Sequence, residues 1–282
     1  MTMMSNASNF RDQSGTPRDD SCSLRESFAI QCRVIRAVIL REMITMFGRH
    51  GLGFAWIFVM PMILTVGITL AWSLRGVSEG GAEIPIAAFA LTGYSTLILY
   101  RNMPSTAAAA VKMNVSLLYH RHVRVIDLFL ARIILQISAI TFSLVTLTIV
   151  FTWIGLMPPP IDPLKALNGW VATAFFGIGM GFFIGAIATK HEWVDHIWHP
   201  ISYILGGIAG AALLMQSVPP KFRNMLLWFP LVHGSECLRD GYFGNKFTPY
   251  YDLSYEYLVS VILIFLGLLQ MRTIRGYSET YH

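Results

Sequence analysis

Apolar residues fall into long runs along the chain, and short polar stretches separate these runs. A helix needs roughly 20 apolar residues to cross the hydrocarbon core of a bilayer. Six runs approach or exceed this length, and they cover residues 52–74, 85–100, 128–153, 168–189, 201–217 and 254–271. The second and fifth runs are short for a full crossing. The pattern predicts an all-α membrane protein with six transmembrane helices between residues 51 and 275.

An amphipathic stretch precedes the first run. At 100° per residue, one broad side of residues 28–47 is apolar, and Arg33, Arg36 and Arg41 lie on or near the other side. The apolar side consists of Phe28, Val34, Ile35, Val38, Ile39, Met43 and Met46. The pattern predicts an interface helix over 27–50 at the inner membrane surface, with a buried soluble helix as the alternative. The polar residues 1–26 predict a disordered cytoplasmic tail.

The longest basic stretch between apolar runs orients the chain. Residues 101–132 contain five basic side chains and a single acid, Asp127. The positive-inside rule places such a stretch in the cytoplasm. Arg272 and Arg275 follow the last run, and the short loops on the opposite side contain few basic residues. Both termini, including the tail 276–282, are therefore expected in the cytoplasm.

Within the basic stretch, a short helix is expected over about 104–122. Pro104 and Ser105 can begin a helix, and Leu117, Leu118 and Tyr119 provide apolar side chains beside basic ones. A helix of this kind suits docking onto another protein. The same composition also fits a solvated loop that only fixes the topology.

A broken segment lies before the last run. Between about 218 and 245, apolar pieces of fewer than ten residues alternate with Pro and Gly, which favours a re-entrant hairpin on the outer side. The candidate residues for a gate or substrate path are Trp56, Trp228, Arg239, Tyr242 and Lys246. Basic and aromatic side chains together suit an acidic, sugar-like ligand. An aromatic belt at the membrane interface has the same composition.

The fourth run contains Gly177, Gly181 and Gly185, spaced four residues apart. Such glycines line one side of a helix and allow a second helix to approach closely. They are therefore assigned to helix packing. A dinucleotide-binding fingerprint is excluded because no strand precedes them.

The stretch KHEWVDHIWHP is the best metal candidate in the chain. It contains His191, Glu192, Asp195, His196 and His199, but their spacing does not match HExxH. The tryptophans within it indicate a turn at the membrane interface. The sequence therefore predicts no metal site, and the three cysteines show no metal-binding or pairing pattern.

Composition limits the function. Hydrophobic residues make up 54% of the 282 residues and charged ones 13%, too few to coat a soluble core. The net charge of +5 comes from arginines beside the spans, so it does not imply nucleic acid. The chain lacks GxxxxGK[ST], a nucleophile elbow and CxxC, which argues against an enzyme. The interiors of the spans offer no ionisable residue for an ion-driven carrier. Energy is expected to come from a partner.

Three segments resemble the membrane subunit of bacterial capsular-polysaccharide ABC exporters, within the type-2 ABC export permeases. They are FGRHGLGFAWIFVMP, YHRHVRVIDLFLAR and LLWFPLVHGSECLRDGYFG, and the similarity runs from about residue 30 to 272. The resemblance implies a homodimer with two copies of a separate ATPase, which binds ATP and magnesium, while this chain holds no cofactor. It also implies export of a lipid-linked acidic polysaccharide from the inner membrane of a Gram-negative cell to periplasmic and outer-membrane partners.

The resemblance also assigns roles to segments of this chain. It places ATPase coupling at Leu117, Leu118, Tyr119, His120 and Arg121, and an outside gate at residues 219–245. The sequence departs from the family pattern at two positions. Met60 stands where many relatives carry Glu, and Phe229 stands where Asn often precedes Pro230.

Other functions remain open at this point. An exporter of O-antigen or teichoic-type polymers would share the fold, as would a small-molecule exporter of the same superfamily. A membrane anchor for a redox complex is a third alternative.

Overall fold

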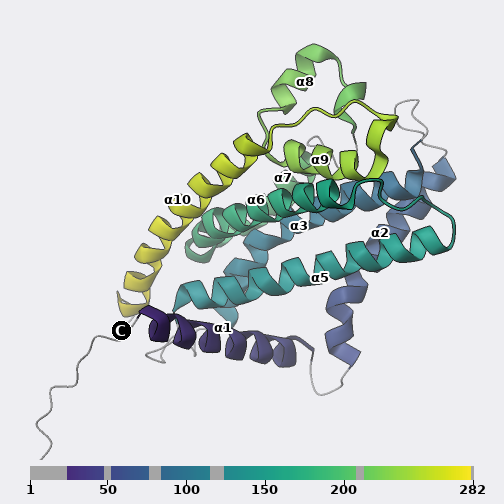
Figure 1. Ribbon diagram of the computed structural model, residues 1–282. Helices are drawn as coiled ribbons and strands as arrows, with labels where there is room; N and C mark the ends of the chain where they lie inside the picture. Colours follow the sequence, from purple (N-terminus) through teal and green to yellow (C-terminus); the bar gives the residue numbers. More distant parts are fainter. Residues whose placement is uncertain (1–23, 48–51, 76–83, 115–123, 208–212, 281–282) are drawn as a thin grey trace, which may run out of the picture.

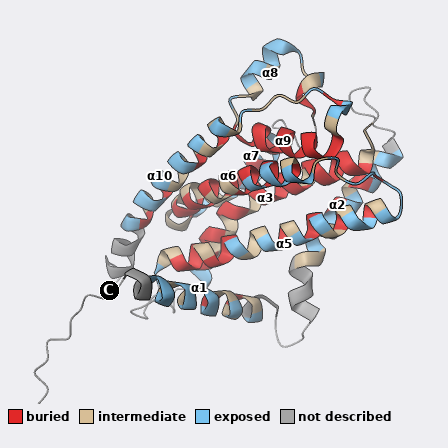
Figure 2. Cartoon of the chain, viewed as in Figure 1, coloured by how far each residue is buried: buried red, intermediate tan, exposed pale blue. Residues whose placement is uncertain are grey.

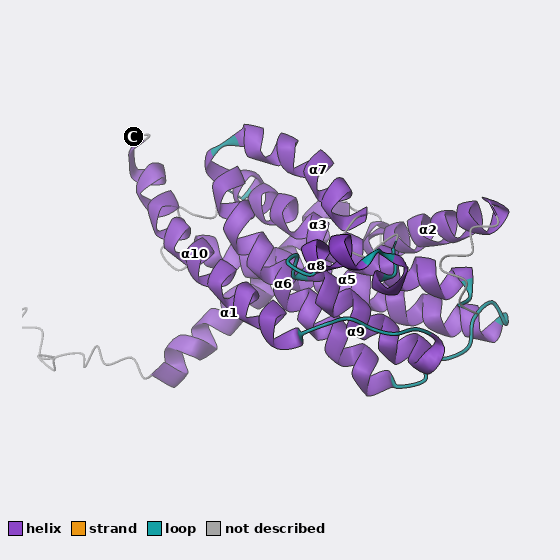
Figure 3. Cartoon of the chain, turned by 90° about the horizontal axis from the view of Figure 1, so that it is seen from above, coloured by secondary structure: helices purple, strands orange, loops and turns teal. Residues whose placement is uncertain are grey.

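The computed structural model describes residues 24–47, 52–75, 84–114, 124–207 and 213–280. Within these ranges the chain forms nine α-helices and two short 3-10 helices and contains no strand, which confirms the all-helical prediction (Figure 3). The α-helices are α1 (Leu24–Phe47), α2 (Leu52–Arg75), α3 (Ile86–Met113), α5 (Val125–Trp153), α6 (Pro163–Lys190), α7 (Glu192–Gly206), α8 (Pro220–Leu226), α9 (Leu231–Phe243) and α10 (Leu253–Thr280). The 3-10 helices are η3 (Met215–Ser217) and η4 (Gly244–Lys246).

Three of the described helices are long and apolar enough to cross a membrane. They are α5, α6 and the part of α10 from Leu253 to Arg272. A shorter apolar helix, Phe58–Leu74, lies within α2. The predicted runs 52–74, 128–153, 168–189 and 254–271 each coincide with one of these helices. The full set of six spans stays a prediction.

The molecule is built around α3 and α6, which lie side by side (Figure 1). Helix α5 packs against α3, while α10 packs against the far side of α6. Helix α9 lies along the first half of α6, where Gly169 of α6 approaches the backbone of α9. Burial is therefore greatest in α3, α6 and α9, and α8 and α10 are largely exposed (Figure 2).

Sequence signals fix where two of the long helices begin. Helix α6 follows Asp162, whose side chain accepts a hydrogen bond from the Lys165 amide at 3.0 Å, and Pro163 occupies the first helical position. Both features favour a helix start. Helix α5 begins where the Asp127 carboxylate accepts a hydrogen bond from the Arg124 amide at 2.8 Å. These caps satisfy amides that have no partner inside the helix.

Helix α3 is longer than predicted. The sequence predicts a span that ends near Tyr100 or extends through Met103, followed by a new helix that begins at Pro104, but α3 continues through Pro104 to Met113. Pro104 is buried against α6, and its carbonyl lies close to Gly185. Proline removes one helix hydrogen bond, and packing against neighbouring helices compensates for such a loss in membrane proteins. The separate helix start at Pro104 is therefore wrong.

The predicted turn at KHEWVDHIWHP is also wrong, because α7 begins at Glu192 and runs through this sequence. Its buried residues are Trp198, Ser202 and Gly206, which are four apart and share one face of the helix. That face packs against α3, where Gly206 lies close to Leu97 and Tyr100.

Helix α1 packs on the bundle through part of its predicted apolar side. Val38 is buried in a small cluster with Ala110, Leu128 and Ala131, and Val34 packs against the same cluster. Protein therefore covers the centre of this side. The outward face of α1 carries exposed apolar and basic residues, namely Leu40, Ile44, Arg33 and Arg36.

Candidate functional site

The most polar part of the interior surrounds α9, all of whose residues are buried. Glu236 accepts hydrogen bonds from the amides of Met215 at 3.2 Å and Tyr250 at 3.3 Å. Arg239 donates a hydrogen bond to the Leu213 carbonyl at 2.8 Å, and its guanidinium carbon lies 4.3 Å from the centre of the Phe89 ring. Glu236 and Arg239 therefore bind the segment that precedes α8 and the segment that follows α9.

His233 links α8, α9 and the start of α10. One ring nitrogen accepts a hydrogen bond from the Asp252 amide at 2.9 Å. The other lies 2.9 Å from the Leu227 carbonyl, to which it donates when the imidazole is neutral. Burial lowers the pKa of His233, while the Leu227 carbonyl and the Asp252 charge act in the opposite direction. The neutral imidazole is therefore the form of His233 that fits these two hydrogen bonds.

Glu256 is a second buried acid in this region and lies in α10. It is fully buried, and neither carboxylate oxygen has a hydrogen-bond partner among the described residues. The carboxylate lies against Gly234 near the start of α9. Glu256 lies near the start of the sixth apolar run, where the sequence analysis expected no buried ionisable group.

An ion pair lies near the C-terminal end of α9. The Lys165 ammonium lies 3.1 Å from the Asp240 carboxylate, which also accepts a hydrogen bond from the Tyr251 hydroxyl at 3.0 Å. Asp240 is buried and Lys165 is half-buried. Together with Glu236 and Arg239, these contacts show that α9 is held by polar groups from several elements.

The predicted gate residues do not share one surface. Arg239 and Tyr242 are buried, and the Tyr242 hydroxyl shares a 2.7 Å hydrogen bond with Thr148. Trp228 and Lys246 are exposed. Trp56 belongs to α2, but its side chain lies outside the described part of the structure. The assignment of these five residues to a substrate path stays a prediction.

Two hollows adjoin predicted gate residues. One, of about 260 Å³, is lined by Asn224, Leu227, Trp228, His233, Asp252 and Tyr255. The other is an apolar hollow of about 260 Å³ between α5, α6 and α9, and it includes Tyr242. The first combines aromatic and polar side chains from α8, α9 and the start of α10, whereas mostly apolar side chains line the second.

The three glycines assigned to helix packing lie on the side of α6 that meets α3 and α5. A Cβ atom at Gly177 would be 2.8 Å from the Met103 sulfur. One at Gly185 would be 3.1 Å from the Ala107 Cβ and 3.1 Å from the Pro104 carbonyl oxygen. A Cβ atom at Gly181 would be 3.1 Å from Ile133 of α5 and 3.3 Å from the Met103 Cβ. Side chains at these positions would push α3 away from α6.

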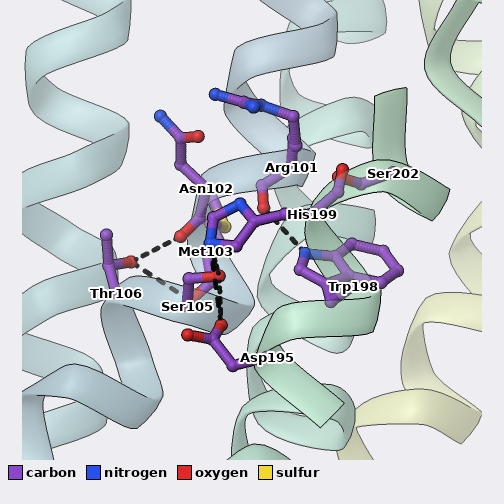
Figure 4. A network of polar contacts seen from close by, with 9 residues as sticks. All are labelled: Arg101, Asn102, Met103, Ser105, Thr106, Asp195, Trp198, His199 and Ser202. Carbon is purple, nitrogen blue, oxygen red and sulfur yellow. Dashed lines mark hydrogen bonds and ion pairs between the residues drawn. The ribbon is translucent and has the colours of Figure 1, made fainter. Parts of the chain in front are cut away.

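The candidate metal ligands are spread along α7. His199 and Asp195 lie 3.9 Å apart, and Asp195 accepts a hydrogen bond from Ser105 of α3 at 2.6 Å (Figure 4). Glu192 instead pairs with Lys112 at 2.9 Å, an ion pair that lowers the pKa of Glu192. In the described ranges, no three His, Cys, Asp or Glu side chains are close enough to share a metal ion.

The same network ties α7 to α3. The Trp198 ring nitrogen donates a hydrogen bond to the Arg101 carbonyl at 2.9 Å, as Figure 4 shows. The Arg101 guanidinium carbon lies 4.0 Å from the centre of the Tyr203 ring. The polar residues of this stretch therefore hold two helices together.

The predicted coupling residues Leu117, Leu118, Tyr119, His120 and Arg121 lie outside the described residues. Of the two departures from the family pattern, Met60 is exposed on α2. Phe229 packs in an aromatic cluster, with ring centres 5.9 Å from Phe176 and 6.4 Å from Tyr100. An apolar residue at position 229 suits these surroundings better than Asn.

Comparison with known proteins identifies the family. The model of the ABC-2 type transporter family matches residues 33–243. The chain belongs to this ABC-2 type transporter family. The match extends from α1 to the end of α9, so it includes His233, Glu236, Arg239 and Asp240 but not Glu256.

Relatives within this family are similar along most of their length. The capsule polysaccharide export inner-membrane protein CtrC of Neisseria meningitidis serogroup B is 39% identical over 246 residues, which cover 87% of this chain and 92% of CtrC. The capsule polysaccharide export inner-membrane protein BexB of Haemophilus influenzae is 33% identical over 253 residues, 90% and 95% of the two chains. The polysialic acid transport protein KpsM of Escherichia coli is 23% identical over 253 residues, 88% and 96%. The resemblance to capsule exporters is thus confirmed.

His233, Glu236 and Glu256 were not predicted from the sequence. A usable signal was present for Glu236, because it lies in the short polar stretch of LVHGSECLRDGYF with apolar residues on both sides. An acid in such surroundings is usually paired and functional or structural. The partners of these residues come from distant segments, which no local pattern reveals.

Proposed function

We propose that this chain is the membrane permease subunit of an ATP-driven exporter of capsular polysaccharide. The observation that carries the proposal is the identity of 39% and 33% to CtrC and BexB over about nine tenths of all three chains. Both relatives are called capsule polysaccharide export inner-membrane proteins. The apolar helices α5, α6 and α10 support a location in the membrane.

The energy for export comes from a separate ATPase subunit in this proposal. The family is that of ABC-2 type transporters, and the sequence contains no GxxxxGK[ST] loop to bind nucleotide phosphates. ATP and magnesium therefore belong to the partner. Two ATPase copies and two permease copies would form the complete exporter, with both permease termini in the cytoplasm of a Gram-negative cell.

The proposed substrate is an acidic polysaccharide on a lipid carrier. The name of KpsM states transport of polysialic acid, an acidic polymer. In this chain, exposed Trp228 and Lys246 offer an aromatic face and a positive charge at the outer end. From there, periplasmic and outer-membrane partners would receive the polymer.

The mechanism that we propose is mechanical. Closure of the ATPases around ATP pushes the segment near Leu117 and Tyr119, and this push tilts spans one and five at the interface between two permease copies. A transition of this kind requires an interface with two stable arrangements. The fifth apolar run, 201–217, is short and interrupted by glycines, which makes it a reasonable place for such a change.

Gene deletion tests the proposed substrate. A strain without this chain should lose surface polysaccharide and accumulate it inside the cell, and the wild-type gene should restore the surface polymer. Analysis of the accumulated sugar separates the alternatives. Accumulation of O-antigen or a teichoic-type polymer would replace capsule as the substrate. An unchanged set of surface polymers would contradict polysaccharide export altogether.

Purification tests the coupling assignment. Substitution of Leu117→Asp together with Tyr119→Asp should abolish co-purification of the ATPase, because charges replace the apolar side chains of the docking segment. Trp153→Ala, at the opposite end of the membrane in the proposed topology, is the matched control and should leave the ATPase bound. Unaltered recovery of the ATPase with the double variant would contradict the docking assignment.

A further inference from the structure

Three polar side chains from three helices meet at the junction of α1, α3 and α5. Glu42, Asn114 and Arg132 are 3%, 4% and 5% exposed, so all three are almost completely shielded from solvent. An Arg132 Nη atom lies 2.7 Å from one Glu42 carboxylate oxygen. The Asn114 side-chain amide donates to the other oxygen and also to the Ala110 carbonyl at 2.9 Å. Both oxygens of Glu42 therefore have a partner.

A second polar contact holds the other half of α1. The Gln31 side chain donates a hydrogen bond to Asp127, the same carboxylate that caps the start of α5. Gln31 and Glu42 are eleven residues apart, which places them on one face of the helix about 16 Å apart. Val38 packs between them against Leu128 of α5. Helix α1 is thus fixed at two polar points with an apolar contact between them.

These contacts lie on both sides of the predicted coupling segment. Asn114 is the residue that ends α3, and Arg124 is the residue that precedes α5. Residues 115–123, which connect them, contain all five predicted ATPase-coupling residues. Helix α1 therefore contacts the chain just before and just after the segment on which the ATPase is proposed to act.

A buried ion pair resists sliding more strongly than an apolar contact does. Removal of one partner leaves an uncompensated charge in a dry site, which is strongly destabilising. The hydrogen bond from Asn114 further restricts Glu42 to a single register. Helix α1 can consequently change its position relative to α3 and α5 only if these contacts break.

We propose that Glu42, Asn114 and Arg132 are positioning residues of the transport cycle, which make α1 move as one body with the inner ends of α3 and α5. The inference rests on the proposed function, because it takes residues 115–123 as the point where the ATPase acts. It assigns α1 to the moving part of the exporter rather than to a fixed anchor on the membrane surface.

Spin labels test whether α1 and α5 move together. One label is attached to the exposed native Cys32 of α1 and the other to Ser138→Cys, an exposed position on α5, in a chain with Cys22→Ser. The labelled chain is diluted with unlabelled chain and purified with the ATPase. The distance between the labels should be the same without nucleotide and with a non-hydrolysable ATP analogue. With Glu42→Gln, the distance distribution should broaden or shift. A change of distance in the unmutated pair would overturn the proposal.

Export measurements separate positioning from simple stability. Glu42→Gln and Arg132→Gln should each retain ATPase binding and ATP hydrolysis, while exported polymer per ATP falls at least about tenfold because each leaves an unpaired buried group. The charge-reversed pair Glu42→Arg with Arg132→Glu restores an attraction and should recover export to within about threefold of wild type. Arg36→Gln, at an exposed position on the same helix, is the matched control and should export normally.

The possible failures are distinguishable. Wild-type export by both single variants would overturn the positioning role. Equal loss of export and of ATPase binding, without rescue by the reversed pair, would show that the three residues only stabilise the fold. That result would also overturn the positioning role. If the wild-type chain itself exports no polysaccharide, the proposed function fails, while the label distances still decide whether α1 follows α5.

Discussion

Gly234 is the residue on which the close contact between α9, α6 and α10 depends. A Cβ atom at this position would lie 2.4 Å from the Thr173 hydroxyl oxygen and 2.8 Å from both Glu256 carboxylate oxygens. Gly234→Ala should therefore destabilise the protein by on the order of 1–3 kcal/mol, because buried neighbours must shift. Thermal unfolding of the purified chain in detergent measures this loss.

Gly67 provides the control for this substitution. It lies in α2, and a Cβ atom there would have no neighbour within 4 Å. Gly67→Ala should leave the unfolding temperature unchanged or raise it slightly, because Ala favours a helix over Gly. Equal effects of the two substitutions would show that the contact at Gly234 does not limit stability.

His233 makes the contact between α8, α9 and the start of α10 sensitive to acid. Its pKa is lowered in the folded chain, so the unfolded chain binds the proton first as the pH falls below about 6.5. Stability is then complete above about pH 6.5 and declines below it, by at most about 1.4 kcal/mol per pH unit for this one group. Unfolding temperatures at pH 7.5 and 5.5 measure the decline.

His233→Gln isolates this contribution. Glutamine can accept from the Asp252 amide and donate to the Leu227 carbonyl, but it does not titrate in this range. The variant should therefore lose less stability between pH 7.5 and 5.5 than the wild type. An unchanged decline would assign the acid sensitivity to groups other than His233.

Single residues were harder to predict than helices. The sequence showed that Arg239 belongs to a basic and aromatic stretch, which fits a surface, but the residue is fully buried over the Phe89 ring. The carbonyl that it binds belongs to Leu213, which lies 26 residues away in the chain. Contacts over such separations depend on the fold, so no local pattern of polar residues reveals them.

At the scale of elements, the contact between α3 and α6 depends on the glycine face of α6. Gly185→Val should force the two helices apart, since even a Cβ atom would lie 3.1 Å from Ala107, Phe129 and the Pro104 carbonyl. We expect destabilisation on the order of 1–3 kcal/mol or more. The amount of folded chain after detergent extraction and its unfolding temperature measure the effect.

Gly185→Ala gives the graded comparison, and its effect should lie between those of wild type and Gly185→Val. A valine variant as stable as the wild type would show that α3 and α6 can separate at little cost. In that case the glycine spacing would not determine their packing.

Hydrophobic runs predicted most long helices but not all their ends. The runs found α2, α5, α6 and α10, because a span must be apolar over its whole length. They failed at Pro104, where burial against α6 lets α3 continue, and at α7, whose polar residues resemble a loop. In α7 the four-residue spacing of Trp198, Ser202 and Gly206 was the signal that could have predicted a helix.

At the scale of the whole molecule, the proposed topology places the two ends of α5 on opposite sides of the membrane. A cysteine at His120, before α5, should react with a membrane-impermeant maleimide only after the inner membrane is opened. A cysteine at Trp153, which is 88% exposed at the other end, should react in cells with an opened outer membrane alone. The positive-inside rule is the physical basis.

Reaction of the His120→Cys variant from outside would contradict the proposed topology. A cytoplasmic ATPase could then not reach this segment. Ser138→Cys, at an exposed position within α5, is a useful third site, because lipid should shield it from both sides.

The filled interior of the chain has a consequence for the route of a polymer. Side chains and glycine contacts occupy the space between α3, α6 and α9 in the described part of the chain, which leaves no tunnel for a sugar strand there. In the proposed dimer, the strand would then travel along the interface that the two copies share, so one inactive copy would impair an intact neighbour. Cells that make equal amounts of an inactive and an intact copy should assemble only about one quarter of their dimers from two intact copies.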